Sequence, residues 1–222
     1  MTGEEASTER RRLLVFGGTF DPVHNGHLIV ARYVAEALGF AKVVLVPTGV
    51  PPHKSGTRAD AKWRLEMLRA AVAGDDLFVV DDLEMRRQGQ SYTFDTIMAL
   101  RRQHGWDTGI FWVIGADMVE DLPKWRRVRE VLDAARIIIA ARPPWDQDMP
   151  RILDGLAGRL SAEHVAQLRK SVVATPLVDI SSTDIRSRVR QGKSIKYLTP
   201  ESVVSIIDAA LLYKEREIPQ KS

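Results

Sequence analysis

The residues from Gly17 to His27 combine features that hold a phosphate group. Two glycines, Gly17 and Gly18, end a short apolar run, and a bare backbone can approach a phosphate closely. A helical pattern begins near Asn25, and the N-terminus of a helix favours an anion because its first amide groups are unpaired. The order of strand, glycine pair and helix start therefore predicts an anion-binding loop after the first strand.

His24 and His27 lie three residues apart within this loop, with Gly26 between them. On the first turn of a helix this spacing places both imidazoles on one face. Gly26 is expected to leave open space over that face, enough for a base or a ribose to lie flat. Two imidazoles beside a bound anion predict a loop that is catalytic in phosphate chemistry.

Each of these features has a plainer interpretation when taken alone. A glycine pair after a strand is a common tight turn, and a single histidine is more often a satisfied polar group than a catalyst. Two histidines also suggest a metal site, but no Asp or Glu completes a zinc set at useful spacing. The prediction depends on the combination of these features at one position in the fold.

Short apolar runs alternate with amphipathic stretches along the chain. The runs are continuous, which is typical of strands that helices cover on both faces. Strands are predicted at residues 13–16, 42–46, 77–80, 110–114, 136–141 and 172–175. Helices are predicted at residues 25–38, 59–73, 93–103, 126–134, 183–190 and 201–212. The alternation indicates an α/β fold with a doubly wound parallel sheet, in which ligands bind beyond the carboxyl ends of the strands.

We expect one domain over residues 13–212, with a small helical part at its C-terminal end. Residues 143–170 interrupt the alternation with a Pro-rich start and weak helical patterns, and we interpret them as an insertion. Residues 1–12 and 213–222 are predicted to be tails. The first tail is predicted to be disordered because it holds glutamates and arginines but no apolar run.

The composition narrows the class of protein. The chain has 222 residues, 45% of them apolar, and no cysteine, which excludes disulfides, thiolate metal sites and a cysteine nucleophile. The net charge is +3, and the arginines are spread along the chain instead of forming the basic stripe of a nucleic-acid binder. No apolar run approaches membrane-spanning length. We therefore expect a cytoplasmic protein with no nucleic-acid partner and no membrane contact.

The loop Gly-Thr-Phe-Asp-Pro-Val-His-Asn-Gly-His resembles the signature of the HxGH nucleotidylyltransferase superfamily. Five further segments are similar to bacterial nicotinate-mononucleotide adenylyltransferases, at residues 47–54, 91–96, 115–117, 122–125 and 180–186. The resemblance implies a Rossmann-like fold and transfer of an adenylyl group from ATP to nicotinate mononucleotide, a step of NAD biosynthesis. The implied products are nicotinate adenine dinucleotide and pyrophosphate. Mg²⁺ is expected with ATP, and we assign it no ligand from the protein.

The resemblance divides the site residues into two halves. His24, His27 and Arg186 would be catalytic, the histidines by binding the triphosphate and stabilising the pentacoordinate α-phosphorus. The ATP half would consist of Gly17, Gly18, Thr19, Phe20, His24, Gly26, His27, Gly115, Asp117, Ile180, Ser181, Ser182, Thr183 and Arg186. The acceptor half would consist of Thr48, His53, Lys54, Tyr92, Thr93 and Trp125.

Several of these residues have a second interpretation. A hydroxyl at Ser182 or Thr183 is as well suited to capping a helix as to binding phosphate. Asp117 would contact the ATP ribose, or it would satisfy amide groups at a helix start. Trp125 would stack on the pyridine ring, or it would pack in the core as we expect of Trp112.

Other activities share parts of these motifs. A sister enzyme would use nicotinamide mononucleotide or phosphopantetheine as acceptor, against which Thr93 and Trp125 argue. A nucleotide-binding regulator would keep the fold without the chemistry, but the chain retains both histidines and Arg186. A class I aminoacyl-tRNA synthetase also has a His-x-Gly-His loop, but this chain is short for one. Whether the chain forms a homo-oligomer is left open.

Overall fold

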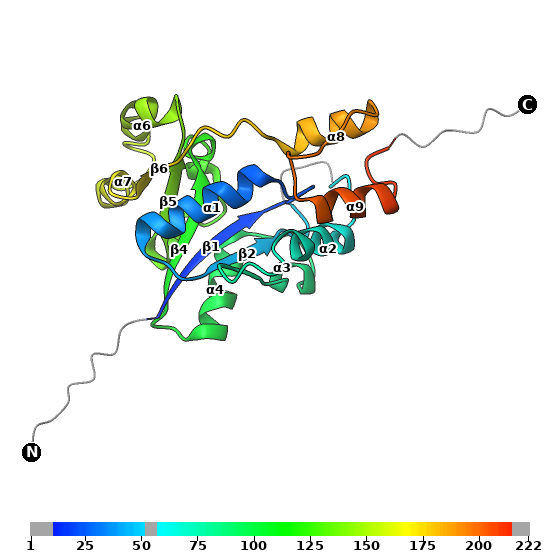
Figure 1. The fold of residues 1–222 in the computed structure, drawn as a ribbon. Helices are drawn as coiled ribbons and strands as arrows, with labels where there is room; N and C mark the ends of the chain where they lie inside the picture. Colours follow the sequence, from blue (N-terminus) through cyan, green and yellow to red (C-terminus); the bar gives the residue numbers. More distant parts are fainter. Residues whose placement is uncertain (1–10, 52–56, 215–222) are drawn as a thin grey trace, which may run out of the picture.

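A six-stranded sheet forms the centre of the structure, a computed structural model that describes residues 11–51 and 57–214 (Figure 1). The order of strands across it is β3-β2-β1-β4-β5-β6, and every neighbouring pair is parallel. The predicted doubly wound parallel sheet is therefore confirmed. The strands are β1 (Arg12–Gly18), β2 (Val43–Pro47), β3 (Phe78–Val80), β4 (Gly109–Gly115), β5 (Arg136–Ala141) and β6 (Val172–Ala174).

Helices cover both faces of the sheet. The α-helices are α1 (Asn25–Leu38), α2 (Ala61–Ala71), α3 (Leu83–Arg86), α4 (Thr93–His104), α5 (Val128–Ala134), α6 (Trp145–Asp154), α7 (Ala162–Arg169), α8 (Ser182–Arg190) and α9 (Glu201–Ala209). Two 3₁₀ turns, η1 (Ala116–Met118) and η2 (Leu122–Lys124), follow β4. The buried side chains form two clusters, one with α1, α2, α8 and α9 and the other with α3 to α7. Within the described ranges, no helix is both long and apolar enough to cross a membrane.

The strand order reverses between β1 and β4. From β1 the chain proceeds outward through β2 and β3, and from β4 it proceeds outward on the other side through β5 and β6. The connections that leave the carboxyl ends of β1 and β4 therefore run in opposite directions. In a sheet of this kind, that divergence leaves a crevice where ligands bind.

The predicted elements are present, and most differences lie at their ends. α1 has the predicted bounds because Gly39 ends it in the left-handed conformation, at φ 66°, as a C-terminal glycine does. α9 ends at Ala209, before the predicted 212, and gives way to a turn in which Leu211 has φ 52°. The short helix α3 was not predicted, since four residues are too few to show a helical period.

Residues 143–170 do not stand outside the alternation. They form α6 and α7 between the paired strands β5 and β6, and Met149 and Leu168 are buried in the core. The predicted insertion is therefore the crossover connection between β5 and β6. The helical pattern of its sequence is weak because α6 and α7 are both short.

Both predicted tails extend too far into the folded chain. Arg12 opens β1 and pairs with Gly109, and the hydroxyl of Tyr213 is hydrogen-bonded to Asp21. Strand pairing holds Arg12 and a side-chain hydrogen bond holds Tyr213. Neither contact is visible in a local sequence pattern. Residues 1–10 and 215–222 of the predicted tails lie outside the described residues.

Candidate active site

A cleft of about 720 Å³ opens at the carboxyl ends of β1 and β4, where the strand order reverses. Residues from both predicted halves form its wall. Those residues are Gly17, Gly18, Thr19, His24, Gly26, His27, Thr48, Tyr92, Thr93, Gly115, Asp117, Trp125, Ile180, Ser181, Ser182 and Thr183. The two halves of the site therefore share one cavity.

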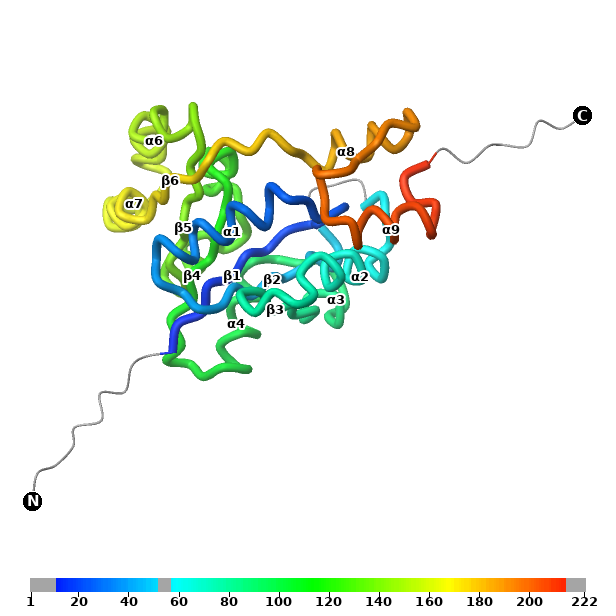
Figure 2. The backbone as a smooth tube through the Cα atoms, viewed as in Figure 1, coloured from blue at the N-terminus to red at the C-terminus, as the bar shows by residue number. Residues whose placement is uncertain are grey.

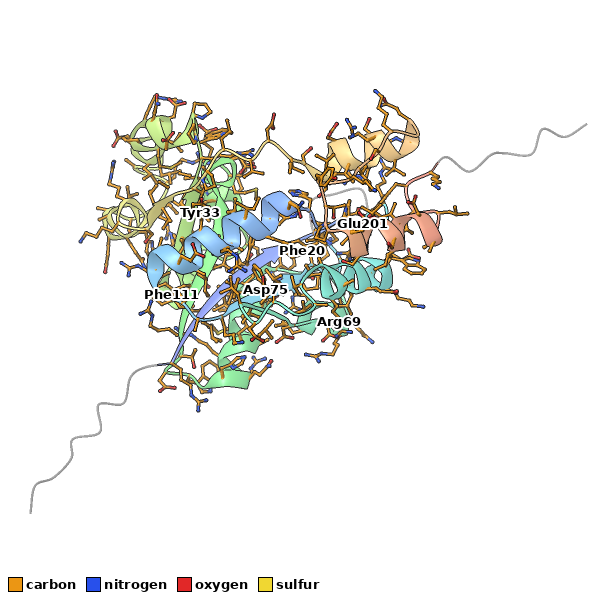
Figure 3. All side chains as sticks on the ribbon, in the orientation of Figure 1. Phe20, Tyr33, Arg69, Asp75, Phe111 and Glu201 are labelled. Atoms are coloured by element: carbon orange, nitrogen blue, oxygen red, sulfur yellow. The ribbon has the colours of Figure 1, made fainter. Side chains whose placement is uncertain are left out.

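Two of the predicted residues that the structure describes, Phe20 and Arg186, are not on this wall. Phe20, labelled in Figure 3, is 1% exposed and contacts the edge of the His27 ring, with centroids 5.1 Å apart. Phe20 therefore supports the His27 ring from within the core, and its contact with ATP stays a prediction. Arg186 lies beside the cleft, as described below. His53 and Lys54 fall outside the described residues.

His24 and His27 lie against each other at the start of α1. Their ring centroids are 3.6 Å apart and the ring planes are inclined by 23°, which confirms the predicted shared face. The backbone N–H of His24 donates to Nδ1 of His27 over 3.2 Å. Because Nδ1 accepts this hydrogen bond, the neutral His27 ring carries its proton on Nε2. His27 is thus a neutral hydrogen-bond donor at Nε2.

Burial lowers the pKa of both histidines. Burial and then the positive charge of Arg142 lower the pKa of His24 from 6.5 to about 4. Burial and then His24 hold the pKa of His27 well below 6.5. Both rings are therefore neutral at pH 7. Arg142, which no sequence pattern singled out, lines the cleft and donates from Nη1 to the Val178 carbonyl over 2.7 Å.

The glycines of the loop make room for aromatic rings. A Cβ at Gly26 would lie 3.0 Å from Nδ1 of His24, so the His24 ring rests closely against Gly26. Gly26 and both histidines still line the cleft, and that a base or a ribose lies flat over them stays a prediction. A Cβ at Gly17 would lie 2.5 Å from the ring of Trp112, which is buried as predicted. Substitution of either glycine would therefore displace a ring next to the cleft.

The N-terminus of α8 reaches the cleft wall. Oγ of Ser181 accepts the backbone N–H of Asp184 over 3.1 Å, so this hydroxyl is the helix cap. The Ser182 hydroxyl donates to the Pro22 carbonyl over 2.8 Å and joins α8 to the loop after β1. The first amide groups of a helix are unpaired and favour an anion. The helix cap is therefore Ser181, and not Ser182 or Thr183, for which capping was the second interpretation. That Ser182 and Thr183 bind phosphate stays a prediction.

Arg186 lies one turn into α8 and bridges two segments. Its Nη1 donates to the backbone carbonyl of Asp21 over 2.7 Å, and its Nη2 donates to Oγ1 of Thr183 over 3.1 Å. The guanidinium is therefore held between the loop after β1 and the start of α8, at the edge of the cleft.

Arg64 is a buried arginine that sequence reasoning missed. It belongs to α2 and is 1% exposed. Its Nη1 donates to the carbonyls of Thr19 and Thr48 over 2.8 and 2.7 Å, and its Nη2 donates to that of Gly49 over 3.0 Å. One guanidinium thus holds the loops after β1 and β2 together. In sequence it is one charged residue of an amphipathic helix, and nothing in that pattern separates it from an exposed arginine.

The predicted acceptor residues come from two segments that meet at the cleft. Tyr92 and Thr93 stand at the start of α4, and Trp125 ends η2. Trp125 is half-buried and packs against the core while it lines the cleft, so the packing interpretation holds. Its stacking on the pyridine ring stays a prediction. The guanidinium of Arg126 lies 4.4 Å from the centroid of the Tyr92 ring. The Arg126 guanidinium and the rings of Tyr92 and Trp125 therefore lie near the N-terminus of α4.

The described residues offer no ready set of side-chain ligands for a metal ion. No three His, Asp or Glu side chains there lie close enough to hold a metal ion. A metal in this cleft would therefore depend on oxygens of a bound phosphate compound and on water.

The chain was compared with protein families and with individual proteins. The model of the cytidylyltransferase-like family matches residues 15–188. A probable nicotinate-nucleotide adenylyltransferase of Marinobacter nauticus is 38% identical over 215 residues, which cover 92% of this chain and 98% of that protein. The protein of the same name from Desulfitobacterium hafniense is 38% identical over 217 residues, covering 92% and 96%. The chain belongs to the nicotinate-nucleotide adenylyltransferase family.

Solved structures share the fold of this family. A nicotinic acid mononucleotide adenylyltransferase of Plasmodium falciparum, complexed with NaAD, superposes with a TM-score of 0.71 at 16% identity, covering 92% of this chain and 98% of that chain. A putative nicotinate-nucleotide adenylyltransferase of Vibrio parahaemolyticus gives a TM-score of 0.62 at 21% identity, covering 93% and 97%. The resemblance to the family predicted from the sequence is confirmed.

Proposed function

We propose that the protein transfers the adenylyl group of ATP to nicotinate mononucleotide, giving nicotinate adenine dinucleotide and pyrophosphate in NAD biosynthesis. The observation that carries the proposal is the single cleft that joins the histidine pair to the start of α4 and Trp125. One end of the cleft offers hydrogen-bond donors and cations, which suit a polyphosphate. The other end offers the N-terminus of a helix and a tryptophan, which suit an anionic aromatic acid.

The reaction needs positioning more than proton transfer. A phosphate oxygen of nicotinate mononucleotide attacks the α-phosphorus of ATP, a new P–O bond forms, and the bond from the α-phosphorus to the bridging oxygen breaks as pyrophosphate leaves. The attacking phosphate is already an anion at neutral pH, so no general base is required. Rate enhancement then comes from holding the two phosphates in line and from stabilising the charge that develops on the transferred group.

The residues of the ATP half suit this task. His27 offers a neutral Nε2–H donor, and burial keeps both histidines from binding a proton that they would have to release. Arg142 and Arg186 supply fixed positive charge at the cleft and at its edge. The start of α8 adds unpaired amide groups. Together these groups would bind the triphosphate and the pentacoordinate α-phosphorus.

Mg²⁺ would enter with ATP. Magnesium in nucleotide sites keeps several waters and binds mainly to phosphate oxygens, which agrees with the absence of a metal cluster among the described residues. When bound, the ion would neutralise charge on the polyphosphate and on the leaving pyrophosphate.

The acceptor half would recognise the pyridine acid. The first amide groups of α4, beginning at Thr93, are free to donate to a carboxylate. Trp125 offers an indole face to the positively charged pyridine ring, an arrangement stabilised by cation–π attraction. An amide in place of the carboxylate would lose the charge-assisted hydrogen bonds.

The proposal is tested by measuring pyrophosphate release from ATP and Mg²⁺ with nicotinate mononucleotide and, in parallel, with nicotinamide mononucleotide. We expect kcat/KM with the acid to exceed that with the amide by about tenfold or more, since hydrogen bonds to charged groups contribute about 1.5–3 kcal/mol. Equal rates would contradict the role of α4, and no turnover with either compound would contradict the proposed reaction.

A matched pair of tryptophan variants assigns the acceptor effect to the site. Trp125→Ala should raise KM for nicotinate mononucleotide and leave KM for ATP near its original value. Trp106→Ala is the control, because Trp106 is 62% exposed and is not part of the cleft wall. Equal effects of the two substitutions would remove Trp125 from the acceptor site.

A further inference from the structure

Asp21 carries a buried carboxylate within the loop that holds the histidines. It is 4% exposed and accepts three hydrogen bonds. Oδ2 accepts the backbone N–H of Arg58 over 2.7 Å, and Oδ1 accepts that of Ala59 over 3.1 Å. The third donor is the Tyr213 hydroxyl, 2.7 Å from Oδ1. The proposed mechanism gives this carboxylate no task, although it lies three residues from His24.

Tyr213 brings the C-terminal end of the described chain to the catalytic loop. It follows α9, which runs beside α2 and is tied to it by a 2.9 Å hydrogen bond from Ser202 to the Ala70 carbonyl (Figure 2). The backbone of Tyr213 is left-handed, at φ 63°. A non-glycine residue holds that conformation only where the surrounding contacts impose it. The contacts at this position include the hydrogen bond to Asp21 and the packing of the Tyr213 ring.

The ring and the hydroxyl of Tyr213 have separate surroundings. The ring packs against the apolar cluster that holds α1, α2, α8 and α9, and a phenylalanine would pack in the same way. The hydroxyl lies near three charged groups, the Asp21 carboxylate and the guanidiniums of Arg64 and Arg186. Burial and the Asp21 carboxylate raise the pKa of the Tyr213 phenol, so it remains a donor at neutral pH.

Asp21 also contacts Arg186, the arginine of the proposed ATP half. Its backbone carbonyl accepts Nη1 of Arg186 over 2.7 Å, while its carboxylate accepts the Tyr213 hydroxyl. One residue therefore receives a hydrogen bond from the C-terminal segment on its side chain and one from α8 on its backbone. The orientation of the Asp21 peptide, and with it the place of the guanidinium, depends on how the carboxylate is fixed.

We propose that Tyr213 is a positioning residue for ATP binding: through the Asp21 carboxylate, its hydroxyl fixes the carbonyl that orients Arg186. This inference rests on the proposed function, because it takes Arg186 as a ligand of the ATP phosphates. Groups that bind phosphate act well only when neighbouring hydrogen bonds hold them in place, and small displacements lower both affinity and rate. The C-terminal turn would thus belong to the ATP site without touching the nucleotide.

The test is the Tyr213→Phe variant, which removes one oxygen and keeps the ring. We expect the affinity for ATP, measured by calorimetry, and kcat/KM for ATP to fall about tenfold, the effect of one hydrogen bond to a charged group. KM for nicotinate mononucleotide should change less than twofold. The thermal midpoint should fall, because the buried carboxylate loses a hydrogen bond worth about 1.5–3 kcal/mol. Tyr33→Phe is the control, since Tyr33 is 48% exposed on α1, outside the cleft wall (Figure 3).

A double-mutant cycle separates positioning from general stability. If Tyr213 acts through Arg186, then Tyr213→Phe in an Arg186→Ala background should change ATP affinity less than twofold. A tenfold loss in both backgrounds, or no loss in either, would overturn the inference. So would a rise of similar size in both KM values, because that pattern marks a structural role. ATP binding needs no acceptor, so failure of turnover with nicotinate mononucleotide would count against the proposed reaction alone.

Asp21→Asn supplies a second variant. It keeps the size of the side chain, but its NH₂ group cannot accept the hydrogen bonds that one carboxylate oxygen receives. We expect it to weaken ATP binding at least as much as Tyr213→Phe does, and the two substitutions combined should be no worse than Asp21→Asn alone. Additive losses would show that the tyrosine acts elsewhere.

Discussion

Among the single residues of the site, His27 has the most closely defined chemistry. Its Nδ1 is occupied by the backbone N–H of His24, its ring is covered by Phe20, and burial lowers its pKa. Only Nε2–H is left for a ligand. A ring held in this way suits donation of a hydrogen bond to a phosphate oxygen and is poorly suited to taking up a proton.

Replacing His27 by Ala tests that role. Loss of one preorganised donor to developing charge lowers kcat by about 10²–10³-fold in comparable sites. We expect a fall of that order in pyrophosphate release, with the circular dichroism spectrum unchanged. His104→Ala, at the far end of α4, is the control and should turn over normally. A near-normal rate for His27→Ala would remove the residue from the mechanism.

At the scale of elements, the site depends on how the loops after β1 and β2 are held in register. Arg64 donates to carbonyls of both loops from α2, and Ser91 accepts the N–H of Gly49 from the segment before α4. A helix, α2, and the segment before α4 thus hold the same loop after β2. Burial lowers the pKa of Arg64, and the nearby Asp21, Tyr213 and Glu84 oppose that shift. These neighbouring groups stabilise the charged Arg64 guanidinium, which donates to its three carbonyl acceptors.

The Arg64→Met variant measures this contribution. It fills much of the same volume but leaves three carbonyls without their donor, and each unsatisfied buried group costs about 1–3 kcal/mol. We expect the free energy of unfolding, from urea titration, to fall by about 3 kcal/mol or more. Arg69→Met is the control on the same helix (Figure 3), because Arg69 is exposed and its ion pair among the described residues is with Asp82. Its loss should be under about 1 kcal/mol. Equal losses in the two variants would show that the loops do not depend on Arg64.

The element pattern of this chain was predictable, and its long-range contacts were not. Continuous apolar runs such as 136–141 identify buried parallel strands, and Gly39 marks the end of α1, because both signals are local. The positions of His24 and His27 on one face follow from helical spacing in the same way. The contacts of Arg64 and Tyr213 join segments far apart in sequence, so no local period reveals them. The sequence therefore locates the cleft more completely than it identifies the residues that support it.

At the scale of the whole molecule, the buried histidine pair couples stability to pH. His24 has a pKa of about 4 in the folded chain and 6.5 when unfolded. Below pH 6.5 the unfolded state therefore binds a proton that the folded state does not, and stability falls as the pH falls. The contribution is fully present above pH 6.5 and is lost toward pH 4. Its full size is about 3 kcal/mol, since one pKa unit corresponds to about 1.36 kcal/mol. His27, whose pKa is also lowered, acts in the same direction.

This coupling predicts a difference between two histidine variants. From pH 7 to pH 5 the free energy of unfolding of the unmodified chain should fall by about 2 kcal/mol from His24 alone, measured by urea titration at each pH. His24→Gln removes the group and should reduce the fall, whereas His104→Gln should not. Saturating ATP should flatten the pH dependence of the unmodified chain, because polyphosphate charge next to the rings raises their pKa values toward those of the unfolded chain. The same slope in His24→Gln as in the unmodified chain would show that the pair is not what makes the fold sensitive to acid.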